Sequence, residues 1–166
     1  DNRVIHPKSE IGIINGLYAT SAGSGGIVPI QIFKNYTSDE TRFSFKLTGS
    51  QGTVMKESVS CAFTAALEHI NKYKSKYSIE NLDVYMKTQF PTGFHIHAPS
   101  GATPKDGPSA GCAFATAFVS RILKIPIRND IAMTGEIDLS GTVSKIGGLV
   151  YKLNGAKKAG VKHVLI

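Results

Sequence analysis

The sequence predicts one mixed α/β (α+β) domain in which helices pack on a mixed sheet. Its 166 residues are the length of one ordinary domain, and 42% hydrophobic against 19% charged residues supplies enough apolar side chains for a core. Apolar residues recur with a period of two in some segments, typical of strands, and of 3.6 in others, typical of helices. Since no apolar run approaches the roughly 18 residues of a membrane-spanning helix, we expect no membrane partner.

The segments before residue 50 are predicted to form strands. One begins at Ile11–Ile13, and a second, Ile27–Phe33, is expected to be an edge or bulged strand because Pro29 cannot donate a ladder hydrogen bond. Glycine and serine between them, in residues 21–26, indicate a turn. Residues Phe43–Leu47 alternate apolar and polar side chains, which is the pattern of a half-buried strand.

The middle of the chain changes period. Apolar residues from Met55 to Ile70 fall at helical spacing. Residues 72–91 are polar, and we expect a connection with a short helix at its start. Residues Phe94–Ala98 form the next predicted strand, with His95 and His97 on one of its faces.

The remainder is predicted to alternate helices with short strands. The expected elements are a buried helix over Ala110–Leu123, a strand over Ile131–Thr134, a hairpin over residues 135–143, a helix over Leu149–Ala159 and a strand over Lys162–Ile166. Asp106 is the expected N-cap of the first of these helices, and Gly160 ends the second as a C′ residue. Helices interspersed with strands indicate a sheet covered by helices.

Charge and cysteine content limit the classes of partner. The chain carries 19 Lys and Arg against 12 Asp and Glu, but the positive residues are scattered and lack interleaved aromatic residues. Solvated faces are therefore favoured, and DNA binding stays open as the weaker alternative. Cys61 and Cys112 are too few for a disulfide framework and match no zinc spacing, so we expect a reducing compartment and no metal site.

The start of the chain also bears on its origin. It opens Asp1-Asn2-Arg3, without a signal peptide and without an initiator Met. We expect a fragment of a longer, intracellular protein.

Two polar residues differ from their neighbours. Ser109 lies where an otherwise apolar helix begins, flanked by glycines, and backbone amides at such a place can stabilise an oxyanion. For Ser109 alone, a capping role is favoured. Lys152 falls on the predicted inward face of the last helix with Leu149, Leu153 and Ala156, where it either extends its amine to solvent or acts as a base with a lowered pKa. Together they suggest a serine nucleophile with a lysine base.

These residues belong to a longer pattern. Residues 101–111, Gly-Ala-Thr-Pro-Lys-Asp-Gly-Pro-Ser-Ala-Gly, closely resemble the nucleophile segment of the Lon protease family. Met133–Ile137, Gly147–Leu149 and the helix with Lys152 follow in the family's order. The blocks Leu47–Ser50, Val54–Ser58 and His95–Pro99 are also similar, so the resemblance covers essentially the whole chain.

The resemblance implies the Lon-type proteolytic domain fold over residues 1–166, the C-terminal part of an ATP-dependent protease. It implies that Ser109 is the nucleophile, that Lys152 is the general base and that Thr134 orients the lysine. Asp106 and the preceding segment would shape the mouth of the site, and the implied substrate-binding residues are Gly101, Ala102, Thr103 and Pro104. His95 and His97 match a family pair that we interpret as supporting the scaffold.

The resemblance also implies partners outside this chain. No Gly-x-x-x-x-Gly-Lys-[Ser/Thr] phosphate loop occurs in the sequence, so this domain needs no cofactor, and ATP and magnesium would bind to an absent ATPase domain. An N-terminal domain would be absent as well. The expected substrates are unfolded or damaged proteins, the expected assembly is a ring of six copies, and the expected location is the cytoplasm or the mitochondrial matrix.

A catalytically silent assembly domain on the same fold is the alternative from another class. Retention of both Ser109 and Lys152 favours catalysis.

Overall fold

The structure, a computed structural model, describes residues 3–36, 42–49, 52–99 and 108–166. Its elements are β1 (Ile13–Ala19), β2 (Gly25–Lys34), β3 (Ser44–Thr48), α1 (Thr53–Lys72), α2 (Leu82–Gln89), β4 (Gly93–His97), a 3-10 turn (Pro108–Ala110), α3 (Gly111–Leu123), β5 (Ile131–Met133), β6 (Glu136–Ile137), β7 (Val143–Ser144), α4 (Leu149–Ala159) and β8 (His163–Leu165). The mixed α/β prediction is confirmed.

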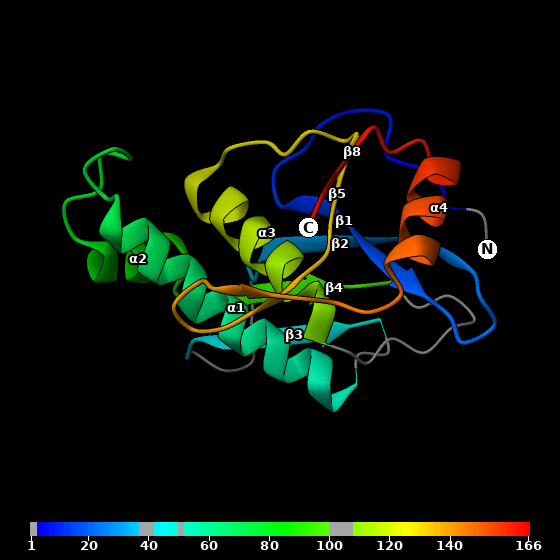
Figure 1. Cartoon of the computed structure of the whole chain (residues 1–166). Helices are drawn as coiled ribbons and strands as arrows, with labels where there is room; N and C mark the ends of the chain where they lie inside the picture. The colour runs from blue at the N-terminus through cyan, green and yellow to red at the C-terminus, as the bar shows by residue number, and fades with distance from the viewer. Residues whose placement is uncertain (1–2, 37–41, 50–51, 100–107) are drawn as a thin grey trace.

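Six strands form one mixed sheet in the order β3-β4-β2-β1-β5-β8, and β6 and β7 form a separate two-stranded ribbon. The central strands β1, β2 and β4 pair antiparallel, whereas β3 pairs parallel with β4, and β5 pairs parallel with both β1 and β8. Figure 1 shows α2 and α4 at opposite ends of the molecule.

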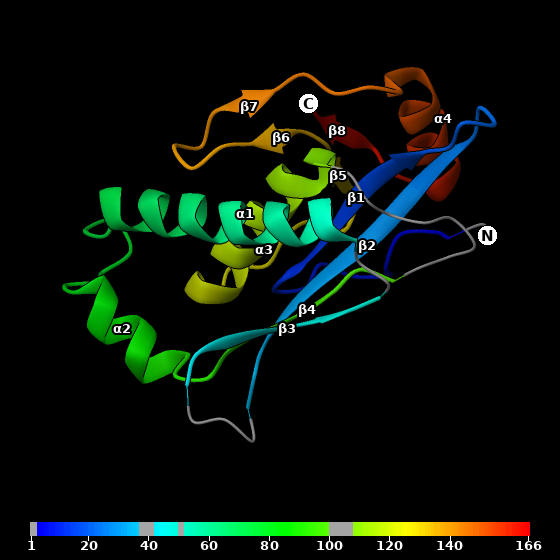
Figure 2. The same ribbon diagram turned by 90° about the horizontal axis from the view of Figure 1, so that it is seen from below.

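Helices cover both faces of the sheet. The larger core lies between the sheet and α1 with α3; Ile30 and Ile32 of β2 belong to it. The smaller core combines Ile27 of β2 and Leu17 of β1 with the inner side of α4. Because side chains of a strand alternate between faces, α4 packs on the face opposite to α1 and α3. In Figure 2, α1 lies to one side of the β1–β2 hairpin, away from α4.

The interior position of β2 differs from the prediction of an edge or bulged strand. Its register with β1 is continuous from Gly25 to Gln31, and Pro29 lies opposite Asn15. The amide of Ile32 donates toward β1, to the carbonyl of Gly12, so the nitrogen of Pro29 faces the other side. Pairing with β4 begins only at Gln31, and Pro29 therefore costs no ladder hydrogen bond.

The short helix between residues 72 and 91 lies at the end of this segment, not at its start. Turns follow α1, and α2 begins after Asn81, whose side-chain oxygen accepts a hydrogen bond from the amide of Val84 at 3.1 Å. Asparagine is a preferred N-cap, and Asp83 adds a negative charge to the first turn. These two residues are the sequence signal for α2.

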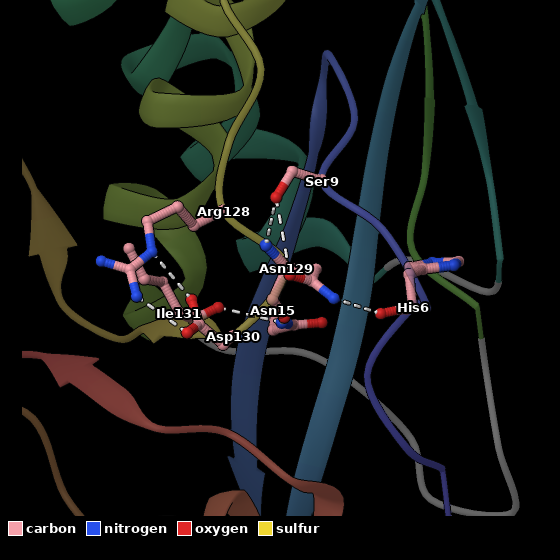
Figure 3. A network of polar contacts seen from close by, with 7 residues as sticks. All are labelled: His6, Ser9, Asn15, Arg128, Asn129, Asp130 and Ile131. Atoms are coloured by element: carbon pink, nitrogen blue, oxygen red, sulfur yellow. Dashed lines mark hydrogen bonds and ion pairs between the residues drawn. The ribbon is translucent and has the colours of Figure 1, made fainter.

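The segment before β1 is tied to the turn before β5, as Figure 3 shows. The Asn129 side-chain amide donates to the carbonyl of His6 at 2.6 Å, and the Asn129 backbone amide donates to the hydroxyl of Ser9 at 3.1 Å. Buried Asn15 donates to the carbonyls of Asn129 and Ile131 at 3.0 and 2.9 Å. These bonds fix where β5 begins.

Glycines let α4 approach the β1–β2 hairpin closely. A Cβ on Gly155 would lie 2.2 Å from the carbonyl carbon of Gly25 and 2.3 Å from the amide nitrogen of Gly26. These atoms are backbone and cannot rotate away. The contact therefore sets the height of α4 above the sheet, and with it the position of every side chain on the inner face of the helix.

We expect Gly155→Ala to lower the free energy of unfolding. Alanine favours the helix by about 0.5–1 kcal/mol, but overpacking costs about 1–3 kcal/mol, and more where backbone meets backbone. Chemical denaturation measures the difference. Gly147→Ala is the matched control, because among the described residues no atom lies within 4 Å of its added Cβ; an equal midpoint for both variants would contradict the close contact.

Candidate active site

The 3-10 turn places Ser109 directly before α3 and against the end of β5. The carbonyl of Ser109 accepts a hydrogen bond from the amide of Gly135 at 2.8 Å, and the carbonyl of Gly135 accepts one from the amide of Cys112 at 3.0 Å. These two bonds fix the turn that carries the serine. They also occupy the Cys112 amide, which is therefore not available to an oxyanion.

Lys152 reaches the same place from α4, on the other face of the sheet. It lies on the inner face of the helix with Gly155, Ala156 and Ala159, and only 5% of the residue is exposed. Its amine lies 3.1 Å from Oγ of Ser109 and 3.2 Å from Oγ1 of Thr134. The alternative that Lys152 extends its amine to solvent is therefore wrong.

The prediction of the inner face was wrong for Leu153, which is 40% exposed. Both residues flanking the lysine, Tyr151 and Leu153, are exposed. The close approach at Gly155 makes the small residues of α4 its buried face. Leu153 lies at the border of that face.

Thr134 is the third member of the cluster and is 2% exposed. Its hydroxyl lies 3.5 Å from the carbonyl of Ser109, to which it donates, and its oxygen accepts from the amine of Lys152. A neutral amine has two N–H bonds and one lone pair. When one N–H is directed at Thr134, the lone pair is free to turn toward the hydroxyl of Ser109. Thr134 is therefore placed where it could orient the amine.

Burial lowers the pKa of Lys152 from its ordinary value of 10.5. Desolvation disfavours the ammonium, and no carboxylate of the described residues forms an ion pair with it that would restore the charge. A lysine with a lowered pKa can supply the neutral amine that a general base requires.

The structure brings Ser109, Thr134 and Lys152 together, while the other predicted site residues cannot be placed. Asp106 and the substrate-binding residues Gly101, Ala102, Thr103 and Pro104 lie outside the described residues. Gly135 was not predicted as a separate site residue, although it lies in the Met133–Ile137 block. Gly135 acts through two backbone hydrogen bonds, and the sequence gives no side chain from which they could be predicted.

The histidines of β4 form contacts of their own. Nε2 of His95 and Nδ1 of His97 lie 2.9 and 2.6 Å from Oγ1 of Thr48 on β3. Burial, and then the charges of Lys46 and His97, lower the pKa of His95. Both side chains share the sheet face opposite to the buried Phe94 and Ile96.

We expect Thr134→Val to reduce turnover by about one to two orders of magnitude, because the amine loses the acceptor that orients it. A valine also removes a polar partner of the ammonium, so the pKa of Lys152 falls further. The pH–rate profile should show a lower plateau reached at lower pH. Thr134→Ser is the matched variant that restores the hydroxyl; an unshifted profile in Thr134→Val would contradict the orienting role.

Residues 2–166 match the family described as the Lon protease (S16) C-terminal proteolytic domain. Over 98% of its length the chain is 57% identical to a "Lon protease homolog" of Acanthamoeba polyphaga mimivirus. It is 45% identical over 96% of its length to a "Lon protease" of Trichlorobacter lovleyi, and 38% identical over 93% to a "Lon protease homolog, mitochondrial" of Phaeodactylum tricornutum. The fold is that of a peptidase domain.

Within that class, the chain belongs to the Lon protease C-terminal proteolytic domain family. It spans 15%, 18% and 17% of the lengths of these three relatives. None of the described helices is both long and apolar enough to cross a membrane.

Proposed function

We propose that this domain is a serine endopeptidase that uses a Ser109–Lys152 dyad. The observation that carries the proposal is the position of the Lys152 amine, buried and 3.1 Å from Oγ of Ser109. A serine hydroxyl is a weak nucleophile unless a base takes its proton, and the Lys152 amine, whose pKa burial lowers, is within hydrogen-bond reach.

The reaction proceeds through an acyl-enzyme. The Lys152 amine accepts the proton of Ser109 as Oγ attacks the scissile carbonyl, and the resulting ammonium then donates this proton to the leaving amine. Water attacks the ester with the same amine as base, which regenerates the free serine. The amide of Ser109 would bind the oxyanion, since the Cys112 amide is occupied.

The longer protein would be an ATP-dependent protease; two relatives, of which the chain covers 15% and 18%, are named Lon protease homolog and Lon protease. ATP and magnesium would bind outside this chain, since its sequence contains no phosphate loop. Substrates would be unfolded or damaged proteins, which present extended segments to the site. A closed ring of six copies would enclose the sites, and the location would be intracellular, in the cytoplasm or the mitochondrial matrix.

Labelling with a peptide boronate tests this proposal, because a boronate forms an adduct with a competent nucleophilic serine and needs no ATP. We expect intact-mass analysis of the full-length protein to show one adduct that maps to Ser109. Absence of an adduct in the assembled protein would favour the silent assembly domain.

A further inference from the structure

Lys152 and its two hydroxyl partners are carried by different parts of the sheet. Lys152 lies on α4, which packs on the β1–β2 hairpin through the close contact at Gly155. Thr134 directly follows β5, and the amide of Gly135 donates to the carbonyl of Ser109, so the serine turn is attached to the end of β5. The position of β5 along β1 therefore determines whether the amine meets both hydroxyls.

The ladder between β1 and β5 is short. β5 has three residues and pairs with β1 at two positions, Asn15 with Ala132 and Gly16 with Met133. On its other side β5 pairs with β8, which also has three residues and lies at the edge of the sheet. The hydroxyl of Thr116 on α3 donates to the thioether of Met133 at 3.1 Å, but sulfur is a weak acceptor. These contacts give little resistance to a shift of β5 along β1.

Asn15 adds two directional hydrogen bonds at this ladder. It is 3% exposed, and its side-chain amide donates both hydrogens, to the carbonyl of Asn129 at 3.0 Å and to that of Ile131 at 2.9 Å. Asn129 is itself held by its bonds to His6 and Ser9, as Figure 3 shows. A shift of β5 would lengthen both bonds and leave a buried donor without an acceptor, which is costly. The amide therefore holds β5 at one position on β1.

We infer that Asn15 is a positioning residue of the peptidase, an inference that rests on the proposed Ser109–Lys152 dyad. By fixing β5 on β1, Asn15 keeps the Lys152 amine 3.1 Å from Oγ of Ser109 and 3.2 Å from Oγ1 of Thr134. Productive geometry tolerates deviations of about 0.5 Å, and a misplacement of about 1 Å can cost about a hundredfold in rate. Loss of the Asn15 amide should therefore slow the chemical step.

Hydrolysis by an Asn15→Ala variant of the full-length protein tests this role. We expect kcat for an unfolded, fluorescently labelled protein to fall at least about tenfold, and KM to stay within about twofold of wild type. Circular dichroism gives the folded fraction, and rates are compared per folded molecule. Asn35→Ala is the matched control, because the Asn35 amide donates to the carbonyl of Thr92 at 3.4 Å, outside the β1–β5 ladder. It should keep kcat within about twofold.

A double-mutant cycle with Thr134→Val separates positioning from a general loss of structure. If Asn15 acts through the contact between Thr134 and Lys152, the combined loss in kcat is smaller than the product of the two single losses. Losses that multiply, or an unchanged kcat in folded Asn15→Ala, overturn the inference. If Asn15→Ala does not fold, Asn15→Ser replaces it, because its hydroxyl can still donate one of the two hydrogen bonds. The same lowered kcat, unchanged KM and coupling to Thr134→Val are expected of it.

Failure of the proposed function gives a different result. Without the dyad, wild type forms no boronate adduct at Ser109, and Thr134→Val keeps the wild-type rate. If the dyad is correct and the inference is wrong, wild type is labelled and Thr134→Val is slow, and only the Asn15 variants depart from the expected result.

Discussion

Ser109→Ala is expected to abolish the boronate adduct and to lower peptide hydrolysis by at least about a thousandfold. Removal of a nucleophile that forms the acyl-enzyme eliminates the covalent route, and what remains is binding and oxyanion stabilisation alone. The fold should not change, because the backbone carbonyl of Ser109 accepts the hydrogen bonds that hold this turn, from the amide of Gly135 and from the hydroxyl of Thr134. Intact-mass labelling and hydrolysis of an unfolded, fluorescently labelled protein measure the two effects.

The matched control for this prediction is Ser24→Ala. Ser24 lies in the exposed turn between β1 and β2, where its hydroxyl contacts Thr20 at 2.8 Å. It should retain the adduct and the full rate. If Ser109→Ala kept the adduct or near-native turnover, the nucleophile would be another residue, and the assignment of Ser109 would be wrong.

The part of the site that the sequence predicted depends on local pattern. Lys152 was expected on the inner face of the last helix, because a helical rotation of 100° per residue brings it to the same side as the apolar residues. Gly160 was expected to end that helix, and it does so with a φ of +94°. The position of Ser109 at the start of a buried helix was a local prediction of the same kind. A helical period and a C-cap are properties of ten or fifteen consecutive residues, so no tertiary contact is needed to derive them.

What the sequence alone could not supply are contacts between distant elements. The hydrogen bonds of Gly135 to the serine turn and the position of Thr48 between two histidines follow from strand order, which no periodicity encodes. The interior position of β2 was missed for a related reason: Pro29 suggested an edge strand, but the partner strand β4 stops before it. The distance between Lys152 and Ser109 likewise depends on how closely α4 approaches the sheet, which Gly155 determines.

Lys152→Met is expected to eliminate hydrolysis and, at the same time, to stabilise the domain. Without the amine, no group of the cluster can take the Ser109 proton at neutral pH, so turnover should fall by at least about a thousandfold. The thioether fits a similar volume without a charge to desolvate. We expect the free energy of unfolding to rise by about 1–2 kcal/mol, which is typical when a polar functional residue is replaced in an apolar setting.

The pH dependence of this stabilisation follows from the direction of the pKa shift. The pKa of Lys152 is lower in the folded protein than its ordinary 10.5. Between these two values the unfolded chain binds more protons, so the stability of wild type rises with pH. The advantage of Lys152→Met should therefore be largest below the folded pKa and should shrink as the pH rises toward 10.5.

Denaturant unfolding at several pH values measures this difference. Lys157→Met, on the exposed side of the same helix, is the matched control and should change the stability by less than about 0.5 kcal/mol at every pH. If Lys152→Met were less stable than wild type, the buried amine would increase the free energy of unfolding, and the prediction that its burial lowers this free energy would be wrong. Only a lysine whose burial is unfavourable, and which is retained for its neutral amine, gives gain of stability together with loss of turnover.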